Sequence, residues 1–116
     1  MTIEASVFGV LDSLVSNRVF PDFAPANTTS PYIVYQQHGG SAANFLEAAV
    51  VGKRNARMRI SCWATTRVAA ANLARQAEDA LIVALKCTVP AAMIAVDETD
   101  VTPPMYGTHQ MFDIWY

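Results

Sequence analysis

A strict alternation of residue types dominates the middle of the sequence. From Ala56 to Ala64 every second residue is small or apolar, and the residues between them are Arg57, Arg59, Ser61 and Trp63. A period of two over this length is typical of a strand with one buried face, because successive side chains of a strand point to opposite sides. The segment therefore predicts a half-buried strand whose apolar face must be covered by another element.

The cover follows directly in the sequence. Thr65 or Thr66 can cap the start of a helix, because a threonine oxygen accepts one of the unpaired N–H groups of the first turn. Apolar residues then recur at helical spacing as Ala70, Leu73, Ala74, Ala77, Ala80, Leu81, Ala84 and Leu85, while Arg67, Arg75, Glu78 and Asp79 lie largely off this stripe. We expect Ile60 of the strand and Leu73 of the helix to be buried between the two layers.

Local patterns predict a second helix and three further strands. Residues 2–15 read as an amphipathic helix capped by Thr2, and Gly9 within it suggests a close packing contact, since glycine costs about 1 kcal/mol relative to alanine. Strands are predicted at Tyr32–Gln37, Ala92–Val96 and Thr108–Tyr116. Three prolines exclude helix and central strand between positions 18 and 31, so this segment is expected to be an ordered, extended connector.

Two surfaces are expected to contact other molecules. If the alternation holds, tryptophans of the middle and last strands share one polar sheet face, which suggests cross-strand packing or a subunit contact. Residues 38–55 predict a long hairpin arm with apolar residues that a monomer's core cannot easily cover, so we expect a partner to order this arm. The candidate interface residues are Phe45, Leu46, Val50, Val51, Arg57, Arg59, Trp63, Asp113 and Trp115.

The composition is that of one domain with few charges. A chain of 116 residues can bury a sufficient core without disulfides or metals. Charged residues make up 16% of the sequence, against about 25% in typical soluble domains. Either the alanine content explains this deficit, or other subunits cover part of the surface. We predict one α+β domain over residues 1–116, with a mainly antiparallel sheet of about four strands, two helices on one face, and the arm.

The cysteines and the apolar segments exclude several other classes. Cys62 and Cys87 have no CxxC partner and no histidine at metal-ligand spacing, so they are predicted to be buried thiols, with a disulfide between them left open. Glu4 and the lack of a basic stretch before an apolar run argue against a signal peptide. The apolar run from Ala80 to Val96 is interrupted by a lysine and a proline and is shorter than the roughly 20 residues of a membrane span.

The order of several short motifs resembles that of a known protein family. The motifs are Arg-Val-Phe-Pro at 18–21, Ala-Pro at 24–25, Pro-Tyr-Ile-Val-Tyr-Gln at 31–36, Arg-Met-Arg-Ile-Ser-Cys-Trp-Ala at 57–64 and Asp-Ile-Trp-Tyr at 113–116. Together they look like the tail completion proteins of long-tailed bacteriophages, which are also called tail terminator or tail-to-head joining proteins. The resemblance spans nearly the whole chain, with a gap between positions 39 and 55.

This resemblance implies a structural virion protein with no catalytic site, cofactor or metal. Such proteins form a homo-oligomeric ring, six-fold in this family, that ends the tail tube and joins it to the head connector or adaptor proteins. DNA would pass through the lumen without sequence-specific binding, and no membrane is involved. The implied location is the head-proximal end of the phage tail, after assembly in the host cytoplasm.

The residues themselves agree with a role that needs no catalysis. The two histidines, His38 and His109, lie outside recognisable catalytic motifs, and the sequence contains no GxSxG, no HExxH and no phosphate-binding glycine loop. The acidic residues Asp97, Glu98 and Asp100 predict a solvated turn rather than a metal site, because a hard cation requires six or more oxygen ligands.

One alternative function stays open. Lys53, Arg54, Arg57 and Arg59 could form the basic face of a small nucleic-acid-binding module. No aromatic residues are interleaved with these four cations, and the net charge of −2 argues against a polyanion-binding protein as a whole.

Overall fold

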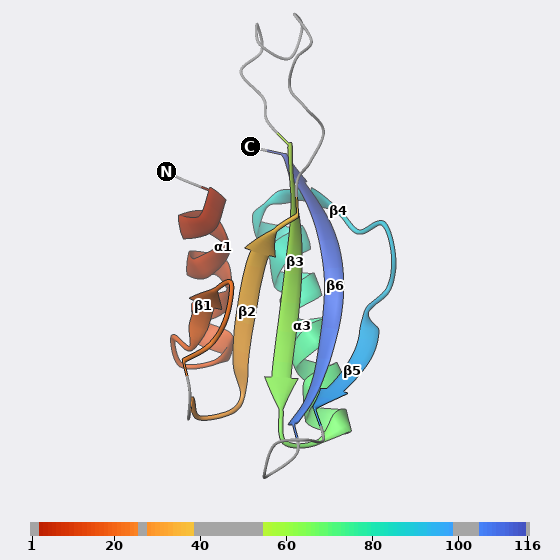
Figure 1. Cartoon of the computed structure of the whole chain (residues 1–116). Coiled ribbons are helices and arrows are strands. Elements are labelled where there is room, and N and C mark those ends of the chain that lie inside the picture. Colours follow the sequence, from red (N-terminus) through yellow and green to blue (C-terminus); the bar gives the residue numbers. More distant parts are fainter. Residues whose placement is uncertain (1–2, 26–27, 39–54, 99–104, 116) are drawn as a thin grey trace, which may run out of the picture.

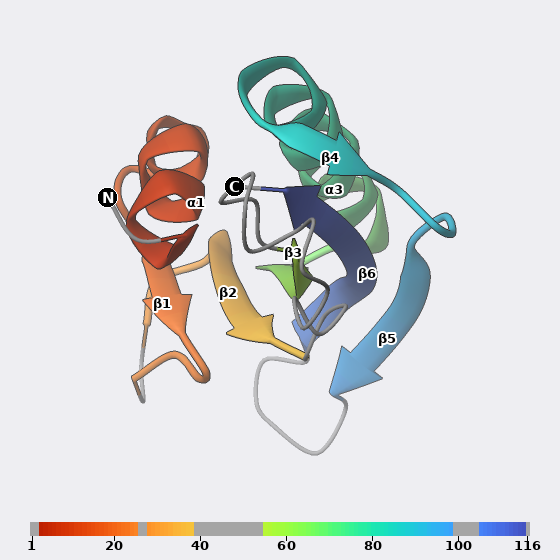
Figure 2. The ribbon, with the colours of Figure 1, turned by 90° about the horizontal axis from the view of Figure 1, so that it is seen from above.

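A computed structural model describes residues 3–25, 28–38, 55–98 and 105–115, and it shows a two-layer α+β fold (Figure 1). The elements in chain order are α1 (Ile3–Leu11), the 3-10 helix η1 (Asp12–Leu14), β1 (Val19–Pro21), β2 (Tyr32–Gln37), β3 (Asn55–Ala64), α3 (Arg67–Ala84), β4 (Lys86–Thr88), β5 (Ile94–Glu98) and β6 (Met105–Trp115). The two α-helices α1 and α3 cover the same face of the sheet (Figure 2). The predicted fold class and helix placement are confirmed.

The sheet has six strands rather than about four. Its order is β1-β2-β3-β6-β4, and β5 also pairs with β6. The pair β1–β2 is parallel and the other pairs are antiparallel, so the sheet is mixed. The four predicted strands are all present. The two additional strands, β1 and β4, have three residues each, which is too short for an alternation to be recognised in the sequence.

The strand bounds differ from the prediction at the C-terminal side of the sheet. β5 begins at Ile94 instead of Ala92, because the chain is still turning before it; there the carbonyl of Ala91 accepts a hydrogen bond from the Gln110 side chain at 3.1 Å. β6 begins at Met105, three residues earlier than predicted, because its first residues pair with both β5 and β3. Strand pairing, rather than local propensity, therefore sets these bounds.

The predicted alternation of β3 is confirmed. Its apolar residues, Ala56, Met58, Ile60, Cys62 and Ala64, are all buried beneath the helices. Ile60 and Leu73 belong to the same buried cluster, with exposed fractions of 2% and 5%. The core thus lies between one face of the sheet and the two helices.

The helix α3 begins and packs largely as its sequence predicts. The Thr66 side chain accepts a hydrogen bond from the Ala69 backbone N–H at 3.1 Å, so Thr66 is the cap. Five residues of the predicted stripe are buried, namely Ala70, Leu73, Ala74, Ala77 and Leu81. The stripe ends earlier than predicted, since Ala80 is half-buried and Ala84 is exposed.

Gly9 of α1 contradicts one expectation. A Cβ atom added to Gly9 would meet nothing within 4 Å, so no close packing contact explains this glycine. We therefore expect Gly9→Ala to raise the free energy of unfolding by about 0.5–1 kcal/mol, because alanine loses less backbone entropy in a helix. Urea unfolding of the two proteins measures the difference. A loss of stability would show that this helix face is in contact with something.

The two cysteines are both free thiols in this structure. Cys62 is buried, and that burial raises the pKa of its thiol to about 12. Cys87 is only half-buried, so the prediction that both are buried is confirmed for Cys62 alone. Burial raises the pKa of the Cys87 thiol as well. Neither cysteine therefore has the low pKa of a reactive nucleophile.

Several predictions fall outside the described residues. The arm residues Phe45, Leu46, Val50 and Val51, the cap Thr2 and the acidic residue Asp100 are among them. The flanking strands β2 and β3 pair antiparallel, as the strands on either side of a hairpin do. Within the described part of the chain, neither helix has the length and hydrophobicity to span a bilayer.

Candidate functional site on the open face of the sheet

The sheet face turned away from α1 and α3 carries most of the candidate residues. We call it the open face. Cross-strand pairing places Gln36 beside Arg59, and Arg59 beside Met111; the next row joins Val34, Ser61 and His109, and a further row joins Tyr32, Trp63 and Gly107. The register therefore assembles residues from β2, β3 and β6 into one continuous surface.

Arg57 and Asp113 form an ion pair on this face. They are directly opposite each other on β3 and β6, and the two hydrogen bonds measure 2.8 Å from Nε to Oδ1 and 3.1 Å from Nη2 to Oδ2. The hydrogen bond from Arg57 holds the pKa of Asp113 below its usual value. Because both side chains are open to solvent, the pair supports the strand register more than it adds stability.

Arg59 is less completely paired. Its Nη2 donates to the Gln36 side-chain oxygen at 3.2 Å, and the same oxygen lies 2.8 Å from Nε2 of His38. The Nε of Arg59 is buried, yet it has no hydrogen-bond partner among the residues that the structure describes. A buried donor without a partner carries an unrecovered desolvation cost, so Arg59 is the residue of this face that most needs a further contact.

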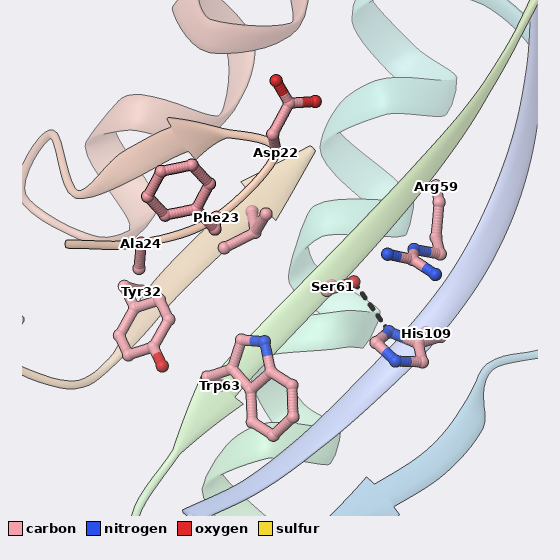
Figure 3. A pocket seen from close by; sticks show the side chains of 9 residues that line it. Asp22, Phe23, Ala24, Tyr32, Arg59, Ser61, Trp63 and His109 are labelled. Carbon is pink, nitrogen blue, oxygen red and sulfur yellow. Dashed lines mark hydrogen bonds between the residues drawn. The ribbon is translucent and has the colours of Figure 1, made fainter. Parts of the chain in front are cut away.

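A pocket of about 380 Å³ lies beside Arg59 (Figure 3). Its lining residues are Asp22, Phe23, Ala24, Tyr32, Val34, Arg59, Ser61, Trp63 and His109. The wall formed by residues 22–24 exists because Asp22 adopts a positive φ of 68°, which turns the chain after β1. Three aromatic side chains, those of Phe23, Tyr32 and Trp63, thus line the same pocket as one arginine, with Phe23 and Tyr32 across the pocket from it (Figure 3).

A second, smaller hollow lies on the other side of Arg59 and His109. Its volume is about 240 Å³, and it is lined by His38, Arg59, Ala91, Ala92, Ile94, His109, Gln110 and Met111. Ile94 is 66% exposed at its rim. Arg59 and His109 therefore separate two depressions of the same sheet face.

Trp63 is held in place by a glycine and a histidine. Its cross-strand partner is Gly107, and a Cβ atom on Gly107 would lie only 2.5 Å from Cε3 of the indole. The Trp63 and His109 rings meet edge to face, with centroids 6.1 Å apart, and Nδ1 of His109 lies 2.7 Å from the Ser61 hydroxyl oxygen. The absence of a side chain at position 107 is what lets the indole lie against β6.

His109 makes the site sensitive to pH. Burial, followed by the charges of Arg59 and His38, lowers the pKa of His109 below its usual 6.5. The unfolded chain then binds a proton at a higher pH than the folded chain, so stability falls as the pH is lowered through this range. We expect the free energy of unfolding to decrease between about pH 7.5 and about pH 5.5, where histidine is the side chain that titrates.

Urea unfolding at both pH values measures this dependence. His109→Gln should lose most of it, whereas His38→Gln should keep most of it. A pH dependence that survives in His109→Gln would assign the effect to another group.

The structure brings together only some of the predicted interface residues. Arg59 and Trp63 line the large pocket, and Arg57 binds Asp113. Trp115, 44% exposed, lies at the far end of β6 opposite position 55, away from Trp63. The sequence predictions missed Phe23 and Tyr32 as site residues, because no periodic pattern marks them. They also did not select His109, although the alternation of the predicted last strand had placed it on this face.

The described residues include no group of three or more histidine, cysteine or acidic side chains placed to hold a metal ion. The predicted acidic turn is wrong for Asp97 and Glu98, which belong to strand β5 and pair with β6. The Glu98 side chain and Asp100 are not described. Aromatic side chains and an arginine thus distinguish the open face, and such side chains are typical of surfaces that bind another molecule.

Comparison with known proteins identifies the family of this chain. A search of curated proteins finds no match. The family model described as Tail completion protein gp17 matches residues 8–95, which include β1, β2, β3 and α3. Because this match covers well over half of the sequence, the chain belongs to the tail completion protein gp17 family, whose members are structural proteins of the bacteriophage tail.

Proposed function

We propose that this protein forms a ring, with six-fold symmetry as the sequence resemblance implies, that ends the tail tube and joins it to the head connector. DNA would pass through the lumen of the ring. Membership of the tail completion family supports a role at the end of the tail. The ring, its partners and its position next to the head are our proposal, and the open face is the surface on which we base it.

The observation that carries this proposal is the incomplete pairing of the open face. Phe23 is 76% exposed, and within the described part of the chain the buried Nε of Arg59 has no partner. Aromatic residues and arginine are enriched in protein interfaces, where a partner covers them and excludes water. A ring provides such a partner for each subunit in turn.

The described cations favour an assembly role over the nucleic-acid alternative. Arg57 is neutralised by Asp113. Asp22 also lines the pocket, but its side chain lies across the pocket from Arg59 (Figure 3). A groove that follows a phosphate backbone needs several uncompensated cations along it. Among the described residues, the open face offers one arginine outside an ion pair, Arg59, whereas Lys53 and Arg54 lie outside the described part of the chain.

Charge reversal at Arg59 tests the proposal. Arg59→Glu should remain folded as a monomer, and it should lower the yield of completed, infectious particles in a complementation assay with phage that lack this protein. Arg59→Gln should have a smaller effect of the same sign. Ser13→Glu, which introduces a negative charge at an exposed position of η1, is the control and should leave the yield unchanged.

Circular dichroism and urea unfolding of each variant separate assembly defects from folding defects. If folded Arg59→Glu joined tails to heads as well as the natural protein does, Arg59 would have no role in assembly. If the natural protein failed to restore particle formation, the function itself would be wrong.

A further inference from the structure

We propose that the pocket beside Arg59 receives Asp79 of a neighbouring copy, so that the outer side of α3 in one subunit docks on the open face of the next. This inference rests on the ring proposed above, and it adds the two surfaces that would meet. Its starting point is the missing partner of Arg59.

The chain leaves Arg59 without a counter-ion among the described residues. Its guanidinium donates to the neutral amide of Gln36, and its buried Nε donates to nothing. The nearest acidic position along β6, Asp113, is already engaged by Arg57 in a bidentate pair. Arg59 as a whole is only partly buried, so the exposed part of its guanidinium can still accept a carboxylate from another molecule, even though that carboxylate cannot reach the buried Nε.

The pocket walls define what surrounds that carboxylate. Tyr32 and Trp63 are half-buried at the wall, and Phe23 is largely exposed at the rim. Aromatic surface next to an arginine fits an acidic side chain that is flanked by aliphatic side chains. The complementary surface is therefore a short amphipathic segment with one acidic residue and apolar neighbours.

The outer side of α3 presents such a segment. Asp79 is exposed, and the residues three and four positions later are Ile82 and Val83, which are 49% and 88% exposed. These spacings put all three side chains on neighbouring positions of one helix surface. Asp79 follows Glu78, whose carboxylate faces inward and accepts a hydrogen bond from Gln110 at 3.0 Å, so only Asp79 of the two is available to a partner.

The two surfaces lie on different layers of the fold. α3 covers one face of the sheet, and the pocket is on the other face (Figures 1 and 3). A contact between two unlike surfaces is heterologous, and repeating it produces a closed ring when the rotation between copies closes. An isologous dimer would instead require both patches to lie within a single self-complementary interface, which patches on opposite layers of one subunit do not. The opposite placement of the two patches thus fits the proposed ring.

A charge exchange tests the contact. Arg59→Glu and Asp79→Arg, made singly, should each lower the yield of infectious particles in the complementation assay by about tenfold or more, because each places like charges together. The double variant should recover to within about threefold of the natural protein, since the exchanged pair is again complementary. Asp12→Arg, a reversal of a carboxylate on η1 rather than α3, is the matched control and should not lower the yield.

The outcomes separate this contact from the proposed function. If the natural protein restores particle formation and the folded Asp79→Arg does so equally well, Asp79 is not the partner of Arg59, although the function stands. If a folded double variant does not recover the yield of infectious particles, Asp79 is again shown not to be the partner of Arg59. Arg59-dependent binding of a single-stranded oligonucleotide together with that failure would assign the pocket to nucleic acid and overturn the proposal.

Discussion

Replacing Ile60 by alanine is expected to lower the free energy of unfolding by about 2–5 kcal/mol. Ile60 lies in the middle of β3, is 2% exposed, and belongs to the core cluster that both helices cover. The loss combines the transfer of three carbon atoms out of the core with the cavity left between sheet and helices. Urea unfolding followed by circular dichroism measures it.

Ile94→Ala is the matched control, because the chain offers the same residue type at an exposed position. Ile94 is 66% exposed on β5 and should change the stability by less than about 0.5 kcal/mol in the free subunit. Equal losses for the two substitutions would mean that the packing faces of the sheet are assigned wrongly. The comparison also removes the intrinsic difference in strand propensity between isoleucine and alanine.

Gly107→Ala should have the next largest effect, a loss of about 1–3 kcal/mol, although alanine normally stabilises a strand relative to glycine. The new methyl group would lie 2.5 to 2.8 Å from three carbon atoms of the Trp63 indole, so the ring must move. Moving it also breaks the edge-to-face contact with His109. The stability from urea unfolding and the tryptophan fluorescence spectrum should both change.

A double-mutant cycle identifies the cause of this loss. In a Trp63→Ala background the methyl group at position 107 has no indole to displace, so Gly107→Ala should then be neutral or slightly stabilising. Gly9→Ala is the same substitution at a position without neighbours. If it raises the free energy of unfolding while Gly107→Ala lowers it, the loss at position 107 does not come from the change of glycine to alanine as such. A loss of equal size in both backgrounds would place the strain in the backbone of β6 instead.

The periodic parts of the fold could be predicted from the sequence. The alternation in β3 correctly separated buried Ile60 from the solvent-facing Arg57, and the helical spacing after Thr66 identified most of the buried side of α3. These signals succeed because burial on one face of a strand or helix imposes a fixed period. The same alternation, applied to β3 and β6, places Arg57 and Asp113 on the open face.

The remaining parts depend on contacts that no period encodes. β1 and β4 become strands because a neighbouring strand offers hydrogen bonds, and a segment of three residues is too short to show a strand pattern in the sequence. The pocket depends on a turn at Asp22 that brings Phe23 into the same pocket wall as Trp63, although forty positions separate the two aromatic residues in the sequence. The environment of Arg59 likewise required the register of β2 against β3 to be known.

The placement of β6 has a consequence for how the protein is made. β6 pairs with β3 along one edge and with β4 and β5 along the other, so it joins the two halves of the sheet. Its residues, 105–115, leave the ribosome after all of these partners. Until then β3 has one unpaired edge and the buried face of the sheet is incomplete, which leaves apolar surface exposed on the nascent chain. Folding should therefore be completed after β6 has emerged, and newly made subunits depend on that last strand before they can present a surface to one another.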